Sequence, residues 1–251
     1  MGVPSRRDGA LARSGVYAFL SGSLAYPHAA GRSDLVDVVL PFVTTVRTGD
    51  RALDSTLAEA IAAHDVSVDE LQAAHGLQFT HIESQDCPPY ETAFGSRDVF
   101  AQSDTMADVA GFYRAHGLQV GGRERERPDH ITTELEFMAF LARKEAVAID
   151  RLGPDEQELC ERTQVLFLRD HLGCWGPGFG RRLELVAVHP FFAVAGRLLE
   201  AWLGADMERL EVEPARVLDE PEPFLPPDDG TCGIDEDPMA DSAVTIGRHR
   251  R

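Results

Sequence analysis

The sequence predicts an all-α protein, with a single helical bundle in residues 1–210 and a mostly disordered, acidic, proline-rich tail in residues 211–251. Three observations support this fold class. Apolar side chains recur every three or four residues in successive segments, which is the spacing of one face of a helix. No alternating pattern typical of strands stands out, and no internal repeat is present. With 251 residues, of which 43% are hydrophobic, the chain can bury one sizeable helical core or two small domains.

Prolines and capping residues divide the first third of the chain. We expect helices over residues 10–26, 33–47, 53–63 and 67–79. Pro27 stops the first helix and Pro41 interrupts the second, because proline has no N–H to donate to a helical hydrogen bond. Ser67 followed by Glu70 has the spacing of a capping box at the start of the fourth helix. The paired prolines within residues 83–96 exclude a regular helix, so we expect an ordered loop or a short helical turn there.

The middle of the chain contains the helix that we expect to be central to the core. A preceding helix should end at Gly117, and residues 119–128 form a polar loop. Asp129 can cap the helix that follows. The apolar face of that helix consists of Ile131, Leu135, Met138 and Ala142.

Two further helices and a final one are expected after the central helix. They cover residues 155–171, residues 179–187, and a last segment that starts at Pro190 and ends at Gly204. The run Gly176-Pro177-Gly178 predicts a turn. The tail then differs in composition: residues 211–251 hold six of the fifteen prolines and eleven acidic residues against four arginines, which is typical of disorder.

The formal net charge of −18 restricts the class of partner. An acidic surface repels phosphate backbones and anionic lipid headgroups, so we expect neither nucleic acid binding nor stable membrane association. The same charge favours attraction to a basic segment of another protein.

The cysteines and the first residues indicate a cytoplasmic protein. The four cysteines form no CxxC pair, which favours a reduced, intracellular chain; they are Cys87, Cys160, Cys174 and Cys232. No apolar run reaches the roughly 18 residues of a membrane span. Ser5-Arg6-Arg7 looks like the start of a twin-arginine export signal, but Asp8 follows and Arg13 interrupts the apolar stretch. We therefore expect the first helix of a cytoplasmic domain here.

No standard catalytic signature is present: the sequence has no GxSxG, HExxH, Walker A or GxGxxG pattern. His171-x-x-Cys174 is half of a metal site without a second pair, so we expect a helix end and a buried thiol rather than a metal. We therefore predict a protein that binds another protein rather than an enzyme.

Asp129-His130 is the most informative polar pair, and three interpretations of it are open. The first is a helix cap beside a surface histidine. The second is a polar recognition point at the lip of a groove. The third is an acid–base pair, for which no nucleophile or second carboxylate is placed.

Other candidate contact residues are aromatic or lie near the paired prolines. Tyr90 can pack and Glu91 can face water; alternatively, Glu91 can hold an arginine of a bound peptide. Tyr113 is expected in the core. Trp175, in a glycine-rich stretch, is a candidate for a partly exposed aromatic anchor.

Several segments in residues 10–203 together resemble one family. They are Leu24-Ala25-Tyr26-Pro27, Cys87-Pro88-Pro89-Tyr90-Glu91-Thr92, Gly111-Phe112-Tyr113-Arg114, Pro128-Asp129-His130-Ile131, Glu134-Leu135-Glu136-Phe137-Met138 and Pro190-Phe191-Phe192. In order and spacing they resemble the redox-enzyme maturation chaperones of the TorD, DmsD and NarJ group. The likeness is strongest to members that serve molybdenum enzymes of the dimethylsulfide, ethylbenzene, chlorate and selenate type.

The resemblance implies an all-helical, single-domain chaperone of the TorD-like type. It implies that the protein binds the twin-arginine signal or N-terminal region of the catalytic subunit of a molybdenum-containing oxidoreductase until the cofactor is inserted. It implies no permanently bound cofactor and leaves open a transient contact with the molybdenum cofactor or a guanine nucleotide. The implied peptide-binding face contains Tyr90, Glu91, Tyr113, Pro128, Asp129, His130 and Trp175.

Two alternatives from other classes remain at this point. One is a hydrolase that uses His130 with Glu91 or Glu134, and the other is a structural subunit of the mature enzyme complex. The acidic tail is longer than the family core requires, and neither its role nor that of Cys232 follows from the sequence.

Overall fold

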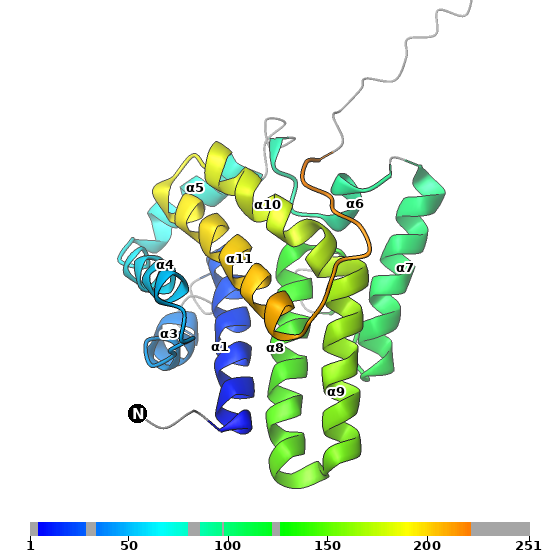
Figure 1. Ribbon diagram of the computed structural model, residues 1–251. Helices are drawn as coiled ribbons and strands as arrows, with labels where there is room; N and C mark the ends of the chain where they lie inside the picture. The colour runs from blue at the N-terminus through cyan, green and yellow to red at the C-terminus, as the bar shows by residue number, and fades with distance from the viewer. Residues whose placement is uncertain (1–4, 29–33, 80–85, 97, 122–125, 222–251) are drawn as a thin grey trace, which may run out of the picture.

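The computed structural model describes residues 5–28, 34–79, 86–96, 98–121 and 126–221, and these residues form a helical bundle (Figure 1). Within these ranges the β-structure is limited to one isolated bridge between Tyr90 and His130. The predicted all-α fold is therefore confirmed. The predictions for residues 222–251, including those for Cys232, lie outside the described residues.

Helix α1 spans Arg6–Leu24 and begins four residues earlier than the apolar pattern predicts. The Ser5 side chain accepts a hydrogen bond from the Asp8 backbone and so caps the helix. Arg6 and Arg7 therefore form the first turn of α1, where they pair with Glu161 and Asp150 on the surface. Among the described helices, none has both the length and the apolar composition that a membrane crossing requires.

The centre of the bundle is formed by α1, α8 (Ile131–Val147) and α9 (Pro154–Phe167), which lie side by side (Figure 1). A short π-helical segment, η3 (Ala148–Leu152), extends α8 before the chain reverses into α9. The four apolar residues predicted for the face of α8 are all buried, so its central position is confirmed.

Helices α10 (Gly173–Val186) and α11 (Pro190–Arg209) pack against each other and cross the central helices (Figure 1). A Cβ atom built on Gly180 would lie 2.7 Å from the carbonyl oxygen of Gly196, and one on Gly196 would lie 2.5 Å from that of Gly180. These glycines therefore allow the two backbones to touch.

The turn predicted at Gly176-Pro177-Gly178 is wrong, because these residues lie inside α10, which follows α9 directly through η4 (Leu168–Leu172). The end predicted at Gly204 is also wrong, since α11 continues to Arg209. In both places glycine permits close contact or is tolerated in the helix, and tertiary packing overrides the local turn signal.

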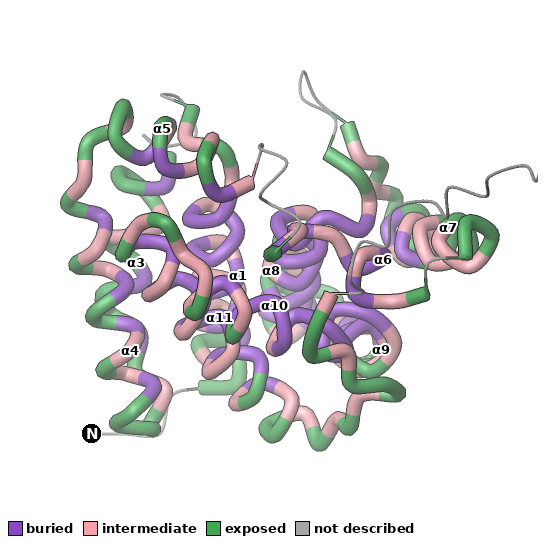
Figure 2. Tube along the Cα trace, turned by 90° about the horizontal axis from the view of Figure 1, so that it is seen from above, coloured by how far each residue is buried: buried purple, intermediate pink, exposed green. Residues whose placement is uncertain are grey.

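Smaller helices flank the bundle on two sides. On one side lie η1 (Leu35–Val39), α3 (Leu40–Val43), α4 (Arg51–Ala62) and α5 (Val68–Phe79), while α6 (Glu91–Phe94) and α7 (Val99–Ala115) lie on the other. The capping bond from the Glu70 backbone to Ser67 and the short helical turn expected in residues 83–96 are both present. Figure 2 shows that buried residues concentrate on α1, α8, α10 and α11, whereas α7 is mostly exposed or half-buried.

After α11 the chain continues as an extended segment, residues 211–221, which we call the strap. It runs back across α10 (Figure 1), and its backbone donates hydrogen bonds from Ala215 to the Arg169 carbonyl and from Leu218 to the Cys174 carbonyl. A Cβ atom on Gly178 would lie 2.5 Å from the Leu218 carbonyl oxygen, so the absence of a side chain at this position allows the strap to pack against α10. Packed structure thus extends about ten residues past the boundary predicted at residue 210.

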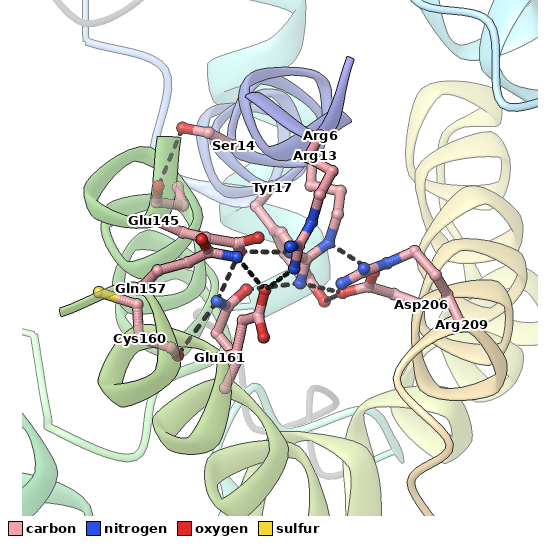
Figure 3. Close-up of polar contacts among 12 residues, drawn as sticks. Arg6, Arg13, Ser14, Tyr17, Glu145, Gln157, Cys160, Glu161, Asp206 and Arg209 are labelled. Atoms are coloured by element: carbon pink, nitrogen blue, oxygen red, sulfur yellow. Dashed lines mark hydrogen bonds and ion pairs between the residues drawn. The ribbon is translucent and has the colours of Figure 1, made fainter. Parts of the chain in front are cut away.

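A buried ion-pair network joins four of the helices (Figure 3). The Arg13 guanidinium, 5% exposed, donates to both carboxylate oxygens of Asp206 and to Glu145 at 3.0 Å. Gln164 donates to the same Glu145 oxygen, and the Tyr17 hydroxyl donates to Asp206 at 2.7 Å. Burial alone would raise the pKa of Asp206, but the charge of Arg13 and its hydrogen bonds hold that pKa below its ordinary value.

Candidate functional site

Two of the segments that carry the resemblance meet at the start of α8. The Glu91 backbone donates to the Asp129 carbonyl and the Ile131 backbone donates to the Pro89 carbonyl, each at 2.9 Å. These bonds form the isolated bridge between Tyr90 and His130. The bridge brings Tyr90, Pro128, Asp129 and His130 together, as the sequence predicts, at what we call the lip.

Asp129 is fully buried and its carboxylate is satisfied from within the protein. Arg127 donates to both of its oxygens, at 2.9 and 2.8 Å, and the Thr92 hydroxyl donates at 2.7 Å. Asp129 therefore does not cap α8, and that expectation is wrong. Its carboxylate instead ties the loop before α8 to helix α6.

His130 is the residue that caps α8, and it is only 8% exposed, so it is not the surface histidine of the first interpretation. The Thr132 backbone donates to Nδ1 of His130 at 3.2 Å, so Nδ1 is an acceptor. In the neutral ring the proton is then on Nε2, which lies 3.9 Å from Glu126. Burial lowers the pKa of His130 to about 4, so the ring is neutral near pH 7.

Tyr90 and Arg127 form the solvent-facing part of the lip. The half-buried Tyr90 ring meets the His130 ring edge-on with the centroids 5.2 Å apart. The Arg127 guanidinium lies 4.5 Å from the centre of the Tyr90 ring, a cation–π contact. Because Asp129 already neutralises Arg127, the lip carries no free positive charge from this pair.

Glu91 and Trp175 lie beneath the lip, in the interior. Glu91 is 1% exposed, and its carboxylate contacts Nδ1 of His171 at 3.1 Å. Trp175 is completely buried, and its indole N–H donates to Glu134 at 3.2 Å. The expectations that Glu91 faces water and that Trp175 is partly exposed are therefore wrong, because both side chains fill the space between α6, α8 and α10.

Glu134 belongs to the same interior cluster. Burial, together with the nearby charge of Glu91, raises the pKa of Glu134 well above its ordinary value. The Tyr113 ring is buried against Phe137, as expected for a core residue, and its hydroxyl donates to the Pro128 carbonyl at 2.8 Å. Tyr113 thus fastens the loop that contains Pro128.

Two hollows flank the first half of α8, and we call them together the α8 groove. The larger, about 380 Å³, is lined by α8 and by residues 118–121 after α7. The smaller, about 310 Å³, lies between α8, α1 and the segment that contains Asp34 and Leu35. The second hollow is lined mainly by apolar side chains, including Tyr26, Phe191 and Phe192. The first is mixed, with Phe137 and Phe140 beside polar side chains such as Thr132 and Thr133.

Glu136 is exposed and is the residue that lines both hollows. The surrounding walls partly desolvate its carboxylate and raise its pKa, although a hydrogen bond from Ser21 opposes this. Glu126 lies at the edge of one hollow and Asp34 at the edge of the other. Among the described residues that line the groove, the charged ones are Glu126, Glu136 and Asp34, and none is lysine or arginine.

The sequence analysis missed Glu136 as a site residue. A signal was available, because Glu136 is a charged residue between Leu135 and Phe137 in the most apolar helix. A larger hollow, about 420 Å³, lies elsewhere, over the Arg13 network. It is lined by residues of both charge signs and so lacks the uniform acidity of the α8 groove.

The His171-x-x-Cys174 pair joins η4 to α10 rather than ending a helix, so that part of the expectation is wrong. The Cys174 thiol is buried, as expected, and donates to the Arg169 carbonyl at 3.0 Å. Within the described residues, no group of three or more His, Cys, Asp or Glu side chains is arranged to hold a metal ion.

Comparison with known proteins adds the family. Residues 45–181 match the family model of the nitrate reductase delta subunit, and the chain belongs to this family. The perchlorate reductase assembly chaperone protein of Dechloromonas aromatica (strain RCB) is 27% identical over 218 residues, which cover 84% of this chain and 95% of that protein.

Two further relatives match a shorter stretch. The selenate reductase assembly chaperone protein of Thauera selenatis is 35% identical over 108 residues, 42% of this chain and 55% of that protein. The chlorate reductase assembly chaperone protein of Ideonella dechloratans is 32% identical over 111 residues, 44% of this chain and 55% of that protein. The predicted resemblance to redox-enzyme maturation chaperones is thereby confirmed, as is the prediction that the protein is a chaperone and not an enzyme.

Proposed function

We propose that this protein is a cytoplasmic assembly chaperone that binds the twin-arginine signal or N-terminal region of the catalytic subunit of a molybdenum-containing oxidoreductase and holds it until its cofactor is inserted. The observation that carries the proposal is the acid-rimmed, apolar α8 groove. It occurs in a chain whose relatives are named assembly chaperones of perchlorate, selenate and chlorate reductases.

The chemistry of the groove complements that of a twin-arginine segment. Such a segment is basic and then apolar, and it docks best where carboxylates adjoin an apolar surface. Glu136 lines both hollows, so a guanidinium paired with it would leave the following apolar residues beside either hollow. The partly desolvated position of Glu136 makes such a pair stronger than one on an open surface.

Glu136→Gln tests this proposal, because the change removes one charge and keeps the shape. We expect the affinity for the signal peptide of the client subunit to fall roughly tenfold, about 1.4 kcal/mol, with unchanged helicity. The measurement is calorimetric titration at fixed salt. Glu158→Gln on α9 is the matched control, because Glu158 is exposed and lies outside both hollows.

A scrambled peptide of equal charge completes the experiment. Selective binding of the true sequence by the unaltered protein, lost in the Glu136 variant and kept in the Glu158 variant, supports the proposal. Equal binding of both peptides, or equal losses in both variants, would mean that only bulk charge is at work, and the groove would have to be abandoned as the site.

The interior geometry favours neither alternative function. A hydrolase using His130 is disfavoured because Nδ1 caps α8, Glu91 faces His171, and Glu134 accepts from Trp175. A structural subunit would co-purify with the finished enzyme, whereas the proposed chaperone should be absent from it. Contact with the molybdenum cofactor or a guanine nucleotide, as part of this proposal, is transient; titration of the chaperone–client complex with each would detect it.

A further inference from the structure

The strap packs against α6, the short helix that follows Tyr90 of the lip. Arg216 of the strap lies 4.0 Å from Glu91, and Arg216 and Leu218 line a small hollow together with Thr92. Thr92 in turn hydrogen-bonds Asp129 and Arg127. Asp219 of the strap pairs with Arg181 on α10, so the chain leaves the described part at Pro221, close to α6 and α10 (Figure 1).

The sequence beyond the strap separates its charges. Residues 222–241 contain seven acidic residues and no basic one. A short apolar stretch, Ala243-Val244-Thr245-Ile246, follows, and after it come Arg248, Arg250 and Arg251. Three arginines beside an apolar stretch have the same chemistry as the segment that the groove is proposed to accept.

We propose that residues 243–251 of this chain occupy the α8 groove when no client is present, with their arginines facing Glu126 and Glu136. The inference rests on the proposed function of the groove as an acceptor of arginine-containing apolar segments. The tethered segment then competes with the client, and a client segment displaces it only by binding more tightly. Selection for a true signal over any basic peptide follows from this competition.

The length of the chain is sufficient for this contact. About 21 residues separate Pro221 from residue 243, and a flexible chain of that length spans roughly 25 Å on average and up to about 70 Å when extended. The folded body of about 220 residues has a radius of gyration near 17 Å. The extended reach of such a linker exceeds the diameter of a body of this size, so residues 243–251 can reach the α8 groove.

Charge also selects the groove over the other large hollow. The hollow above the Arg13 network is lined by four arginines and by three carboxylates, those of Glu145, Glu161 and Asp206. These carboxylates already pair with Arg6, Arg13 and Arg209, whereas the charged side chains of the described α8 groove lining are all acidic. The remaining competitor for the arginines is the acidic run of residues 222–241, and the experiment separates the two.

The expected effect follows from the tether. For a flexible linker of about 21 residues, the effective concentration of a tethered segment is on the order of 1 mM. If the segment alone binds with a dissociation constant of about 0.1 to 1 mM, it raises the apparent dissociation constant of the client roughly two- to tenfold.

The test compares full-length proteins in calorimetric titrations with the client signal peptide. In the variant R248Q/R250Q/R251Q we expect the peptide to bind roughly two- to tenfold more tightly than in the unaltered protein. The matched control makes the same change of net charge at three exposed arginines around the turn between α8 and α9, R143Q/R151Q/R162Q, and should leave the affinity within twofold.

A second measurement asks where the arginines bind. In the Glu136→Gln background, the same triple change should have much less effect, because both act on one contact. A synthetic peptide of residues 240–251 should also compete with the signal peptide on the triple variant. Unchanged or weaker binding of the client peptide by the triple variant overturns the inference. An equally large gain in affinity from the triple change in the Glu136→Gln background also overturns it, because the arginines would then bind the acidic residues 222–241 rather than the groove. Absence of client binding in every variant overturns the proposed function itself.

Discussion

Replacement of Asp129 by asparagine separates a structural role from a contact role at the lip. The carboxylate is fully buried and accepts from Arg127 twice and from Thr92. Asparagine keeps the shape but removes the charge and presents an N–H₂ group to one of these donors.

The magnitude follows from the environment of each partner. Removing one member of a buried ion pair costs about 3–5 kcal/mol when the other is left buried. The Arg127 side chain is 44% exposed and can regain water, so we expect a smaller loss, about 2–3 kcal/mol. For a domain of this size that corresponds to a decrease in melting temperature of roughly 5–10 °C.

The assay is urea unfolding followed by far-ultraviolet circular dichroism at 25 °C, with peptide titration on the same samples. Well below the unfolding midpoint, client affinity should stay within about threefold of the unaltered protein, since Asp129 does not face the groove. A variant as stable as the parent, within about 0.5 kcal/mol, but with client binding abolished would refute this reasoning and make Asp129 a direct contact.

Three further predictions follow from the same structure. Arg13→Met should lower the free energy of unfolding by about 3–5 kcal/mol at pH 7. The loss should shrink toward pH 4, because Asp206 of the variant, buried and without the Arg13 charge, can take up a proton; a pH-independent loss in urea unfolding would contradict this. Gly178→Val should detach the strap from α10, because a side chain at this position would collide with the backbone of Leu218. Amide hydrogen exchange should become faster in the strap and stay unchanged in α8; unchanged exchange in the strap would refute the contact between Gly178 and Leu218. Burial lowers the pKa values of His75 and His130 to about 4, so the unfolded chain binds more protons than the folded protein between pH 6.5 and 4. The free energy of unfolding should therefore be highest above pH 6.5 and fall across this window, by at most about 3 kcal/mol per histidine. The fall should be smaller in His130→Asn, which keeps a capping side chain.

The sequence predicted those elements whose evidence is local. The position of α8 followed from one apolar face, and the start of α5 followed from Ser67 and Glu70. The turn predicted at Gly176-Pro177-Gly178 was wrong because these residues pack inside α10: the Leu203 side chain of α11 lies against Gly176, and the backbone of the strap lies against Gly178. Neither contact can be read from residues 176–178 alone.

The candidate site shows the same division. Spacing indicated that the pair Asp129-His130 begins a helix. Which of the two residues caps the helix depends on Thr92 and Arg127, because these side chains hydrogen-bond to the Asp129 carboxylate. Thr92 is 37 residues away along the chain, so no local pattern contains this information. The burial of Trp175 likewise depends on packing between distant helices.

The segments that reveal the family are therefore mostly interior, and this bears on where recognition occurs. Asp129 and Glu134 are fully buried and Glu91 almost so, and their polar atoms bind other parts of the same protein. Such residues hold α6, α8 and α10 together and so determine the shape of the groove. Under the proposed function, exposed residues on the rim, above all Glu136 and Glu126, would discriminate between client segments, because a charge that contacts a partner must be open to it before binding. On this reasoning, exchanging rim residues between two chaperones of the family should exchange client preference, whereas exchanging the interior residues should change only stability.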